Sequence, residues 1–350
     1  MPIDPPNSAL PRMKARPEES GRPGEFELIA RIFAPLARNA PGAFDLTDDV
    51  ALLTPPPGHE IVLKTDSLIE GVHFRRDDPA STVGRKALRR ALSDLAAKGA
   101  EPAGYLLALA LPRWPDMAWL EEFARGLALD QEEFKLSLVG GETNATPGPV
   151  TLTITALGFV RNGALIRRKG AKPGDAVFVT GKIGDAGAGL AVLEQSQHTR
   201  QTNLSSPRNY KFLIARYRLP APRLGFGRSL AGLASASIDV SDGLLADLEH
   251  IADVSGVRIE VEANAIPLSA GLRELWGDGP EVRLRAATAG DDYEIAFTAP
   301  SAAGAMIRRT ARQTGTEVTL IGRAVSGRGA AFLDGSGVEI PVKRRGYTHF

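Results

Sequence analysis

Cysteine is absent from the 350 residues of this sequence, and histidine occurs only five times. The first absence excludes disulfides, thiolate metal sites and cysteine nucleophiles. The scarcity of histidine argues against a metal site built from a histidine cluster. Acidic side chains are plentiful by comparison, with 41 Asp and Glu residues. Carboxylate oxygens of this kind suit hard cations such as Mg²⁺.

The sequence also lacks a charge imbalance and a long apolar run. Its 42 Lys and Arg residues almost balance the acids, and the formal net charge is +1. This balance argues against a nucleic-acid-binding protein driven by a basic surface. No apolar segment approaches the roughly 20 residues of a membrane-spanning helix, and no signal-peptide core is recognisable. We therefore expect a cytoplasmic protein that binds neither nucleic acid nor membranes.

Predicted strands and helices alternate in each half of the chain, which is typical of α/β proteins with some α+β character. A chain of this length favours two domains. Residues 1–23 are rich in proline and charge and lack apolar periodicity, so we predict a disordered extension there. A polar, glycine-containing segment after residue 161 marks the junction between predicted domains 24–161 and 162–350.

Many acidic residues follow predicted strands or begin predicted helices, next to apolar sequence. Asp66 ends the strand IVLKTD, and Asp239 and Asp242 flank Val-Ser in SIDVSDGLL. Helix capping would explain some of these acids. Asp94 fits capping least, because it lies inside the helical pattern ALSDLAAKG, where a carboxylate needs a partner. Clustered acids that bind Mg²⁺ are typical of phosphoryl-transfer sites.

Two glycine-rich nucleotide-binding motifs are disfavoured. The segment GKIGDAGAG at residues 181–189 follows a predicted strand, but its glycine spacing is not GxGxxG. A Rossmann oxidoreductase is therefore disfavoured. The P-loop motif GxxxxGK followed by Ser or Thr does not occur either. The polar stretch at residues 194–210, which comes after the predicted helix of this segment, is predicted to be an exposed loop.

Six segments, in this order along the chain, resemble the motifs of the thiamine-monophosphate kinase family: FDLTDDVALL, KTDSLIEGVHF, ALSDLAAKGAEP, LVGGETNATPGP, IDVSDGLLADL and AGDDYEIAF. The resemblance covers about residues 24 to 350, and six motifs in order are specific. The family belongs to an ATP-binding superfamily that includes aminoimidazole ribonucleotide synthetase. The resemblance implies a homodimer in which the N-terminal sheet-and-helix domain forms a barrel-like core, followed by a C-terminal α/β sandwich.

The resemblance also implies ATP-dependent phosphorylation of thiamine monophosphate to thiamine diphosphate by direct in-line transfer, the last step of thiamine diphosphate biosynthesis. Seven residues would ligate several Mg²⁺ ions: Asp49, Thr65, Asp66, Asp94, Glu142, Asp239 and Asp242. Three would contact ATP: Gly141, Arg168 and Ser241. Three would contact thiamine monophosphate: His73, Glu294 and Tyr347. No general base is expected, because the acceptor is already an anionic phosphate oxygen.

Three positions depart from the family's usual pattern. Thr47 stands where Gly is usual, Lys64 replaces a small hydroxyl residue, and Glu142 replaces Asp. These departures keep a non-catalytic Mg-ATP-binding regulator open as an alternative. An enzyme similar to aminoimidazole ribonucleotide synthetase is a second alternative, although GVHF and GDDYE favour the kinase. Selenophosphate synthetases and hydrogenase-maturation relatives rely on cysteine or selenocysteine, and a chain without cysteine fits neither.

Overall fold

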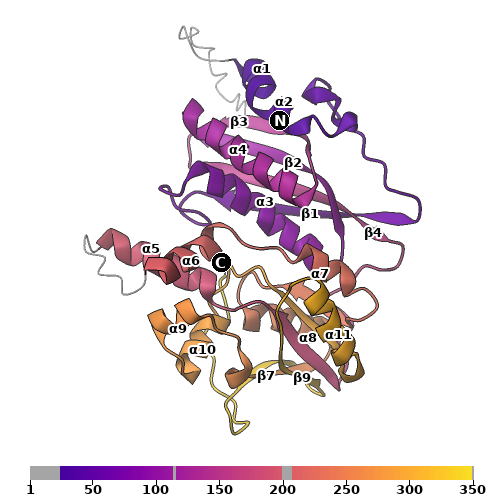
Figure 1. Ribbon diagram of the computed structural model, residues 1–350, viewed down its shortest axis with the longest axis vertical. Coiled ribbons are helices and arrows are strands. Elements are labelled where there is room, and N and C mark those ends of the chain that lie inside the picture. The colour runs from indigo at the N-terminus through magenta and orange to yellow at the C-terminus, as the bar shows by residue number, and fades with distance from the viewer. Residues whose placement is uncertain (1–23, 113–115, 199–206, 349–350) are drawn as a thin grey trace, which may run out of the picture.

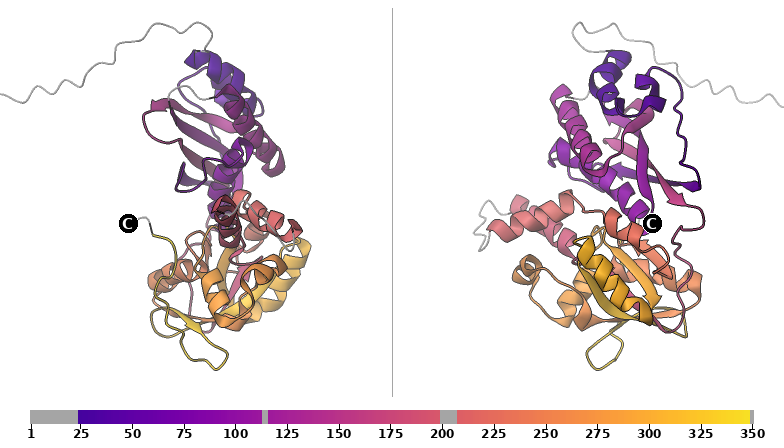
Figure 2. Two further views of the ribbon diagram at one scale, coloured as in Figure 1. Left: turned by 90° about the vertical axis from the view of Figure 1, so that its left-hand side faces the viewer. Right: turned by 45° about the vertical axis from the view of Figure 1, so that its right-hand side comes forward.

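The computed structural model describes residues 24–112, 116–198 and 207–348, so the predicted disorder of residues 1–23 lies outside the described residues. Two β-sheets with their helices lie one beyond the other along the long axis of the molecule (Figure 1). The side view shows the same two halves, with helices at the waist between them (Figure 2). The mixed α/β class expected from the sequence is confirmed. Within the described part of the chain, no helix is long and apolar enough to cross a membrane.

The first half contains a four-stranded sheet in the order β1-β4-β2-β3. Its strands are β1 (His59–Ile69), β2 (Glu101–Pro112), β3 (Leu138–Thr146) and β4 (Thr151–Arg161). β4 runs antiparallel to β1 and β2, and β3 runs parallel to β2. One face packs against α3 (Ala80–Ala97) and α4 (Met117–Phe134). Four short helical segments precede β1: α1 (Glu25–Leu28), η1 (Ile29–Phe33), α2 (Ala34–Ala37) and η2 (Pro41–Leu46).

The two faces of this sheet differ because side chains alternate along each strand. On β1, Leu68 is fully buried on the face that packs against α3 and α4, which we call the inner face. Lys64 and Asp66 share that face, because they precede Leu68 by four and two residues. Ile61 and Leu63 lie on the opposite, outer face and are 43% and 66% exposed. The outer face therefore carries apolar side chains that no described element buries.

The second half contains a six-stranded sheet in the order β10-β7-β9-β5-β8-β6. Its strands are β5 (Asp175–Thr180), β6 (Ala236–Asp239), β7 (Arg258–Glu262), β8 (Ile295–Pro300), β9 (Val318–Val325) and β10 (Gly329–Leu333). Its helices are α5 (Asp185–His198), α6 (Pro207–Arg218), α7 (Leu224–Ser229), α8 (Leu244–Ser255), η3 (Ala263–Ala265), α9 (Ala270–Trp276), α10 (Pro280–Ala287), η4 (Ser301–Ala303) and α11 (Gly304–Gln313). The domain boundary expected after residue 161 falls at the end of β4, and we retain it as a proposal.

Helix α3 packs against both halves of the molecule. Its Leu88 and Leu92 are fully buried in the core of the first half. Ala96 and Ala97, at its C-terminal end, pack instead in a cluster with Phe297 of β8. The helix therefore lies between the two sheets, and a polar side chain near its C-terminal end can reach residues of both.

Candidate active site

Three carboxylates meet where β1, α3 and β6 come together. Asp66 lies on the inner face of β1, Asp94 lies on α3, and Asp239 ends β6 with 3% of its surface exposed. Lys64 Nζ lies 2.8 Å from Asp94 Oδ2 and 3.7 Å from Asp66 Oδ1. We call Asp66, Asp94 and Asp239 the acid cluster. Its members come from distant parts of the sequence and are assembled by the position of α3 between the sheets.

Burial and mutual repulsion determine the electrostatics of the acid cluster. Burial raises the pKa of Asp239 well above its usual value, and the negative charge of Asp94 raises it further. Burial also raises the pKa of Asp94, although Lys64 opposes this effect. Buried carboxylates that repel one another are stabilised by a cation, and a donor set made of oxygens suits Mg²⁺. The residues present therefore fit a Mg²⁺ site.

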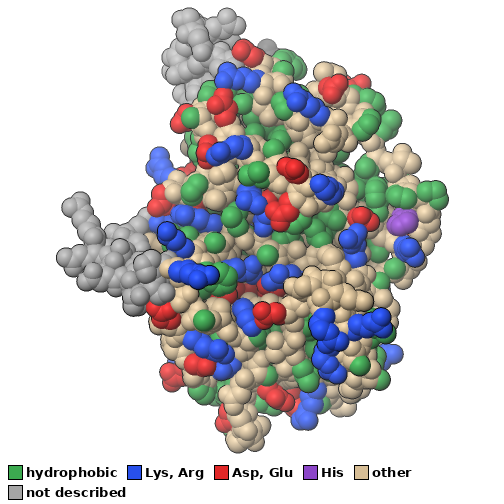
Figure 3. Space-filling model, in the orientation of Figure 1, with side chains coloured by type: hydrophobic (Ala, Val, Ile, Leu, Met, Phe, Trp, Pro, Cys, Tyr) green, Lys and Arg blue, Asp and Glu red, His purple; other side chains and the backbone are tan. Residues whose placement is uncertain are grey.

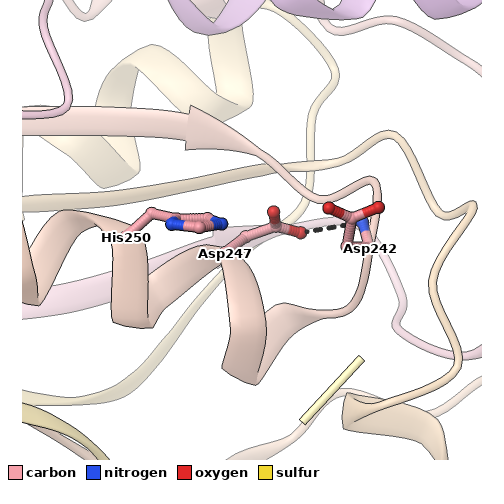
Figure 4. Close-up of side chains that lie close together, drawn as sticks. All are labelled: Asp242, Asp247 and His250. Atoms are coloured by element: carbon pink, nitrogen blue, oxygen red, sulfur yellow. Dashed lines mark hydrogen bonds between the residues drawn. The ribbon is translucent and has the colours of Figure 1, made fainter. Parts of the chain in front are cut away.

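The turn between β6 and α8 carries further acidic groups. The Asp247 carboxylate accepts hydrogen bonds from the backbone N–H groups of Ser241 at 2.9 Å, and of Asp242 and Gly243 at 3.2 Å each. Ligand atoms of Asp242, Asp247 and His250 lie within 4.8 Å of one another, and the close-up shows Asp242 on the turn in a row with Asp247 and His250 of α8 (Figure 4). Burial, together with the charge of Asp242, raises the pKa of Asp247 to about 7.

Two basic residues lie beside the acid cluster. Lys98, which follows α3, donates a hydrogen bond from Nζ to the carbonyl oxygen of Ser237 at 2.5 Å. Burial lowers the pKa of Lys98 to about 8, the positive charge of Arg168 acts in the same direction, and Asp239 opposes both. The Arg168 side chain itself is exposed. Anionic groups that approach the acid cluster therefore meet positive charge next to it.

Glu294 is fully buried and pairs with two arginines. Arg216 Nη2 lies 2.9 Å from Glu294 Oε1, and Arg223 donates to both carboxylate oxygens at 2.5 and 2.7 Å. Thr180 Oγ1 donates to Oε2 at 2.7 Å. A cavity of about 200 Å³ opens beside this group. Asp185 also lines the cavity, and its buried Oδ2 atom has no hydrogen-bond partner within the described part of the chain.

The segment that precedes Glu294 is held in an unusual conformation. Asp291 and Tyr293 have φ values of +63° and +52°, a region that residues other than glycine rarely adopt. Asp291 accepts hydrogen bonds from Lys86 Nζ at 2.7 Å and from the Tyr293 hydroxyl at 2.8 Å. The Asp292 carboxylate accepts the backbone N–H of Gly184 at 2.8 Å. These contacts offset the backbone strain, which is typical of segments that position functional groups.

Comparisons with known proteins place this site in a family. Residues 47–160 match the N-terminal domain of AIR synthase related proteins, and residues 172–334 match the C-terminal domain. The thiamine-monophosphate kinase of Caulobacter vibrioides is 41% identical over 331 residues, which cover 93% of this chain and 91% of that protein. The enzyme of the same name from Escherichia coli K12 is 38% identical and covers 93% of this chain and 98% of its own. The chain belongs to the thiamine-monophosphate kinase family.

Solved structures agree with this family. The thiamine-monophosphate kinase of Stenotrophomonas maltophilia has a TM-score of 0.75 and 39% identity, covering 82% of this chain and 89% of its own. A structure of AaThiL complexed with AMPPCP and TMP has a TM-score of 0.72 and 32% identity, covering 93% and 97%. The hydrogenase maturation protein HypE in complex with ATP shares the fold, with a TM-score of 0.74 at 19% identity over 93% of this chain and 96% of its own. The resemblance inferred from the six motifs is confirmed.

The Mg²⁺ ligands expected from the thiamine-monophosphate kinase family are only partly brought together on one chain. Three form the acid cluster, and Asp242 lies on the turn that follows Asp239. Thr65 lies on the outer face, where its Oγ1 is 3.0 Å from Thr155 Oγ1. Glu142 is exposed on β3, and Asp49 is exposed in the segment before β1. Strand alternation separates Thr65 from the neighbouring Asp66, because adjacent residues point to opposite faces.

The residues expected to contact ATP or thiamine monophosphate are spread over several elements, and of these Ser241 and Tyr347 lie at the turn that follows Asp239. Gly141 of β3 faces β2 so closely that a Cβ there would overlap the carbonyl oxygen of Leu107. His73 Nδ1 accepts the backbone N–H of Ile69 at 3.0 Å, in the turn after β1. Tyr347 donates its backbone N–H to Asp242 O at 2.9 Å. The C-terminal segment therefore reaches the turn after β6.

Four residues of the site were not predicted from the sequence. Asp247 and His250 are three residues apart on α8, which places them on one side of that helix. This spacing is only a weak indication of a shared site. Arg216 and Arg223 precede their partner Glu294 by more than 70 residues. No local pattern in the sequence indicates such a pairing.

Proposed function

We propose that the protein transfers the γ-phosphoryl group of ATP directly to the phosphate of thiamine monophosphate, which gives thiamine diphosphate and ADP. The observation that carries the proposal is the acid cluster, a set of buried carboxylates between the two sheets in a chain of the thiamine-monophosphate kinase family. Its structural relative AaThiL was solved with AMPPCP and TMP together. The protein's cytoplasmic location stays a prediction.

Asp66, Asp94 and Asp239 would hold Mg²⁺, and Asp242 would contribute from the next turn. Bound Mg²⁺ supplies positive charge that offsets the repulsion between the two phosphate-bearing substrates. The side chains around it bind and orient. Lys98 and Arg168 provide positive charge beside the acid cluster. No proton has to be removed from the acceptor, because its phosphate oxygen is already anionic, so the site needs no general base.

His73, Glu294 and Tyr347 remain the proposed contacts for thiamine monophosphate. Glu294 is held rigidly by Arg216 and Arg223, and the cavity beside it offers space for part of a small molecule. A fixed, fully buried carboxylate at a cavity wall can orient a polar ring. We accordingly place the organic part of the substrate on this side of the site and its phosphate towards the acid cluster.

We also propose that two copies of the chain associate through the outer face. Ile61 and Leu63 on β1 and Leu106 on β2, two strands separated by β4, are apolar and between 38% and 66% exposed. Burial of such an apolar patch favours association. The view of Figure 3 is from the side of α3 and α4, so the outer face is turned away there, and the hydrophobic side chains at its right-hand edge lie beside that face. Thr65 and Glu142 lie on the same face, so a second copy would bring them into the interface.

The acceptor distinguishes this proposal from its alternatives. Purified protein incubated with ATP and Mg²⁺ should convert thiamine monophosphate to thiamine diphosphate, and should leave free thiamine almost unchanged, because free thiamine lacks the phosphate that the site is built to hold. Chromatography of the thiamine phosphates measures both reactions. Binding of Mg-ATP without thiamine diphosphate would favour a non-catalytic regulator. Consumption of formylglycinamidine ribonucleotide would favour the synthetase reaction.

A further inference from the structure

Lys64 stands inside the group of carboxylates that would bind metal. Its Nζ is 2.8 Å from Asp94 Oδ2, 3.7 Å from Asp66 Oδ1 and close enough to Asp239 to interact with it electrostatically. Within the described residues, Lys64 is the only Lys or Arg with a side-chain nitrogen within 4.0 Å of a carboxylate oxygen of the acid cluster. Its side chain is 30% exposed, and the Asp94 side chain is 15% exposed.

The other nearby cations have different partners. Lys98 donates to the carbonyl oxygen of Ser237 rather than to a carboxylate. Arg90 lies over the ring of Tyr293, with its guanidinium carbon 5.6 Å from the ring centre. Among the residues that the structure describes, Lys64 alone therefore bridges two members of the acid cluster by direct ion pairs.

An ammonium group and a metal ion would compete for this position. Mg²⁺ needs oxygen ligands at about 2.0 to 2.1 Å. The Lys64 ammonium already lies at hydrogen-bond distance from Asp94 Oδ2. A metal ion that binds this oxygen on the same side has to displace the ammonium or share the carboxylate with it, and it is repelled by its positive charge.

We propose that Lys64 is a positioning residue that acts as a resident counter-ion of the acid cluster: it holds Asp66 and Asp94 together without metal and weakens Mg²⁺ binding to them. This inference rests on the proposed Mg²⁺ site and adds a role for a side chain that itself binds no metal. The metal-free protein is stable because the ammonium offsets the repulsion between buried carboxylates. Mg²⁺ binding is correspondingly weaker, because part of the charge that would attract the ion is already neutralised.

The test compares Lys64→Met, which keeps the length of the side chain and removes its charge, with wild type. Mg²⁺ alone is titrated into the nucleotide-free full-length protein in a calorimeter, and melting temperatures are recorded in EDTA and in Mg²⁺. Lys64→Met should bind Mg²⁺ roughly tenfold more tightly. Lys64→Met should melt at a lower temperature than wild type in EDTA. Addition of Mg²⁺ should raise its melting temperature by more than it raises that of wild type.

Two variants serve as controls. Lys64→Arg retains the charge and should keep the Mg²⁺ affinity and the Mg²⁺-dependent melting shift of wild type. Lys172→Met removes a positive charge from an exposed position and should change neither quantity. Lys64→Val, which suits a β-strand and adds no oxygen ligand, repeats the measurement if Lys64→Met does not fold.

The outcomes separate this inference from the proposed function. Equal Mg²⁺ affinities for wild type and Lys64→Met would overturn the role of Lys64 and leave the metal site in place. If Lys64→Met melts at a lower temperature but does not bind Mg²⁺ more tightly, Lys64 has a packing role. That result would also overturn its role as a counter-ion. Absence of Mg²⁺ binding in both proteins would overturn the metal site together with the inference.

Discussion

At the scale of single residues, the proposed chemistry depends on carboxylates held in apolar surroundings. Asp239 is buried next to the like charges of Asp94 and Asp247, and its pKa is raised mainly by burial. A buried carboxylate in this setting destabilises the metal-free fold unless it is protonated or neutralised by a cation. The arrangement therefore lowers the stability of the metal-free protein and raises its affinity for metal ions.

Replacing Asp239 with Asn should separate these two effects. Asp239→Asn removes a repelled negative charge, so the metal-free protein should melt at a higher temperature than wild type. Its turnover should fall by at least about 100-fold, because a carboxylate near the transferring phosphoryl group is lost. Melting temperatures in EDTA and in Mg-ATP, with a kinetic assay, measure both effects. Asp253→Asn, at an exposed position on α8, should match wild type. Normal turnover of Asp239→Asn would contradict the metal assignment.

Asp185 gives a prediction on pH dependence. Burial raises its pKa above the usual value, so the folded protein holds this proton at pH values where the unfolded chain has lost it. The resulting contribution to stability is present at low pH and is lost as the pH rises through the raised pKa. Asp185→Asn carries no such charge. Its free energy of unfolding should therefore exceed that of wild type increasingly from about pH 4 upwards, as denaturant titrations at several pH values would reveal. If the difference in free energy of unfolding between Asp185→Asn and wild type becomes smaller as the pH rises, the predicted direction of the pH dependence is wrong.

At the scale of elements, the turn from β6 to α8 brings Ser241 and Asp242 beside the acid cluster. Gly243 has φ +139° and ψ +141°, which only glycine adopts without strain. A Cβ at this position would also lie 3.2 Å from backbone atoms of Thr288 and Arg345. The conformation of the turn thus depends on one glycine and on the Asp247 carboxylate that caps it.

Gly243→Ala should destabilise the protein by about 1 to 3 kcal/mol, because alanine is strained in this conformation. It should also weaken the stabilisation by Mg-ATP, since Asp242 shifts with the turn. Gly225→Ala is the matched control: Gly225 lies in α7, its Cβ would meet open space, and alanine is favoured in a helix. Thermal melts of the two variants measure the difference. Equal melting temperatures would show that the turn tolerates a side chain.

Sequence patterns predicted the elements that carry the acid cluster. They did not predict the ends of α5 and α6 or the ion pair between Lys64 and Asp94. The alternation of β1 and the helical periodicity of α3 located Asp66 and Asp94 correctly, because both patterns are local. The prediction of an exposed loop over residues 194–210 was wrong at both ends, since α5 continues to His198 and α6 begins at Pro207. The polar composition there resembles a loop, but tertiary packing overrides such a preference. The pairing of Lys64 with Asp94 could not be predicted either, because no local pattern relates two residues 30 positions apart on different elements.

At the scale of the whole molecule, the predicted Mg²⁺ ligands lie on two different faces of the first sheet. Asp66 lies on the inner face, whereas Thr65 and Glu142 lie on or beside the outer face. Neither side chain can join the acid cluster of its own chain from there. An association of two chains through the outer face would give these residues a new environment, and it would cover Leu63.

Leu63→Asp should convert the proposed dimer into a monomer, because a buried, unpaired carboxylate at an interface is strongly unfavourable. Light scattering coupled to size-exclusion chromatography measures the mass. Leu320→Asp is the matched control, since Leu320 is 56% exposed on β9 of the other sheet. That variant should keep the mass of wild type. A wild-type protein with the mass of a single chain would contradict the proposed dimer directly.

In the proposed reaction, a phosphoryl group passes directly from ATP to a phosphate acceptor at the acid cluster. The most direct test follows the γ-phosphorus of ATP, labelled with ³²P, after incubation with thiamine monophosphate and Mg²⁺. We predict that the label appears in thiamine diphosphate, at its terminal phosphate, and that Asp94→Asn forms almost none. Label that appears only in inorganic phosphate, or that stays in ATP while the protein binds ATP, would contradict direct transfer at this site.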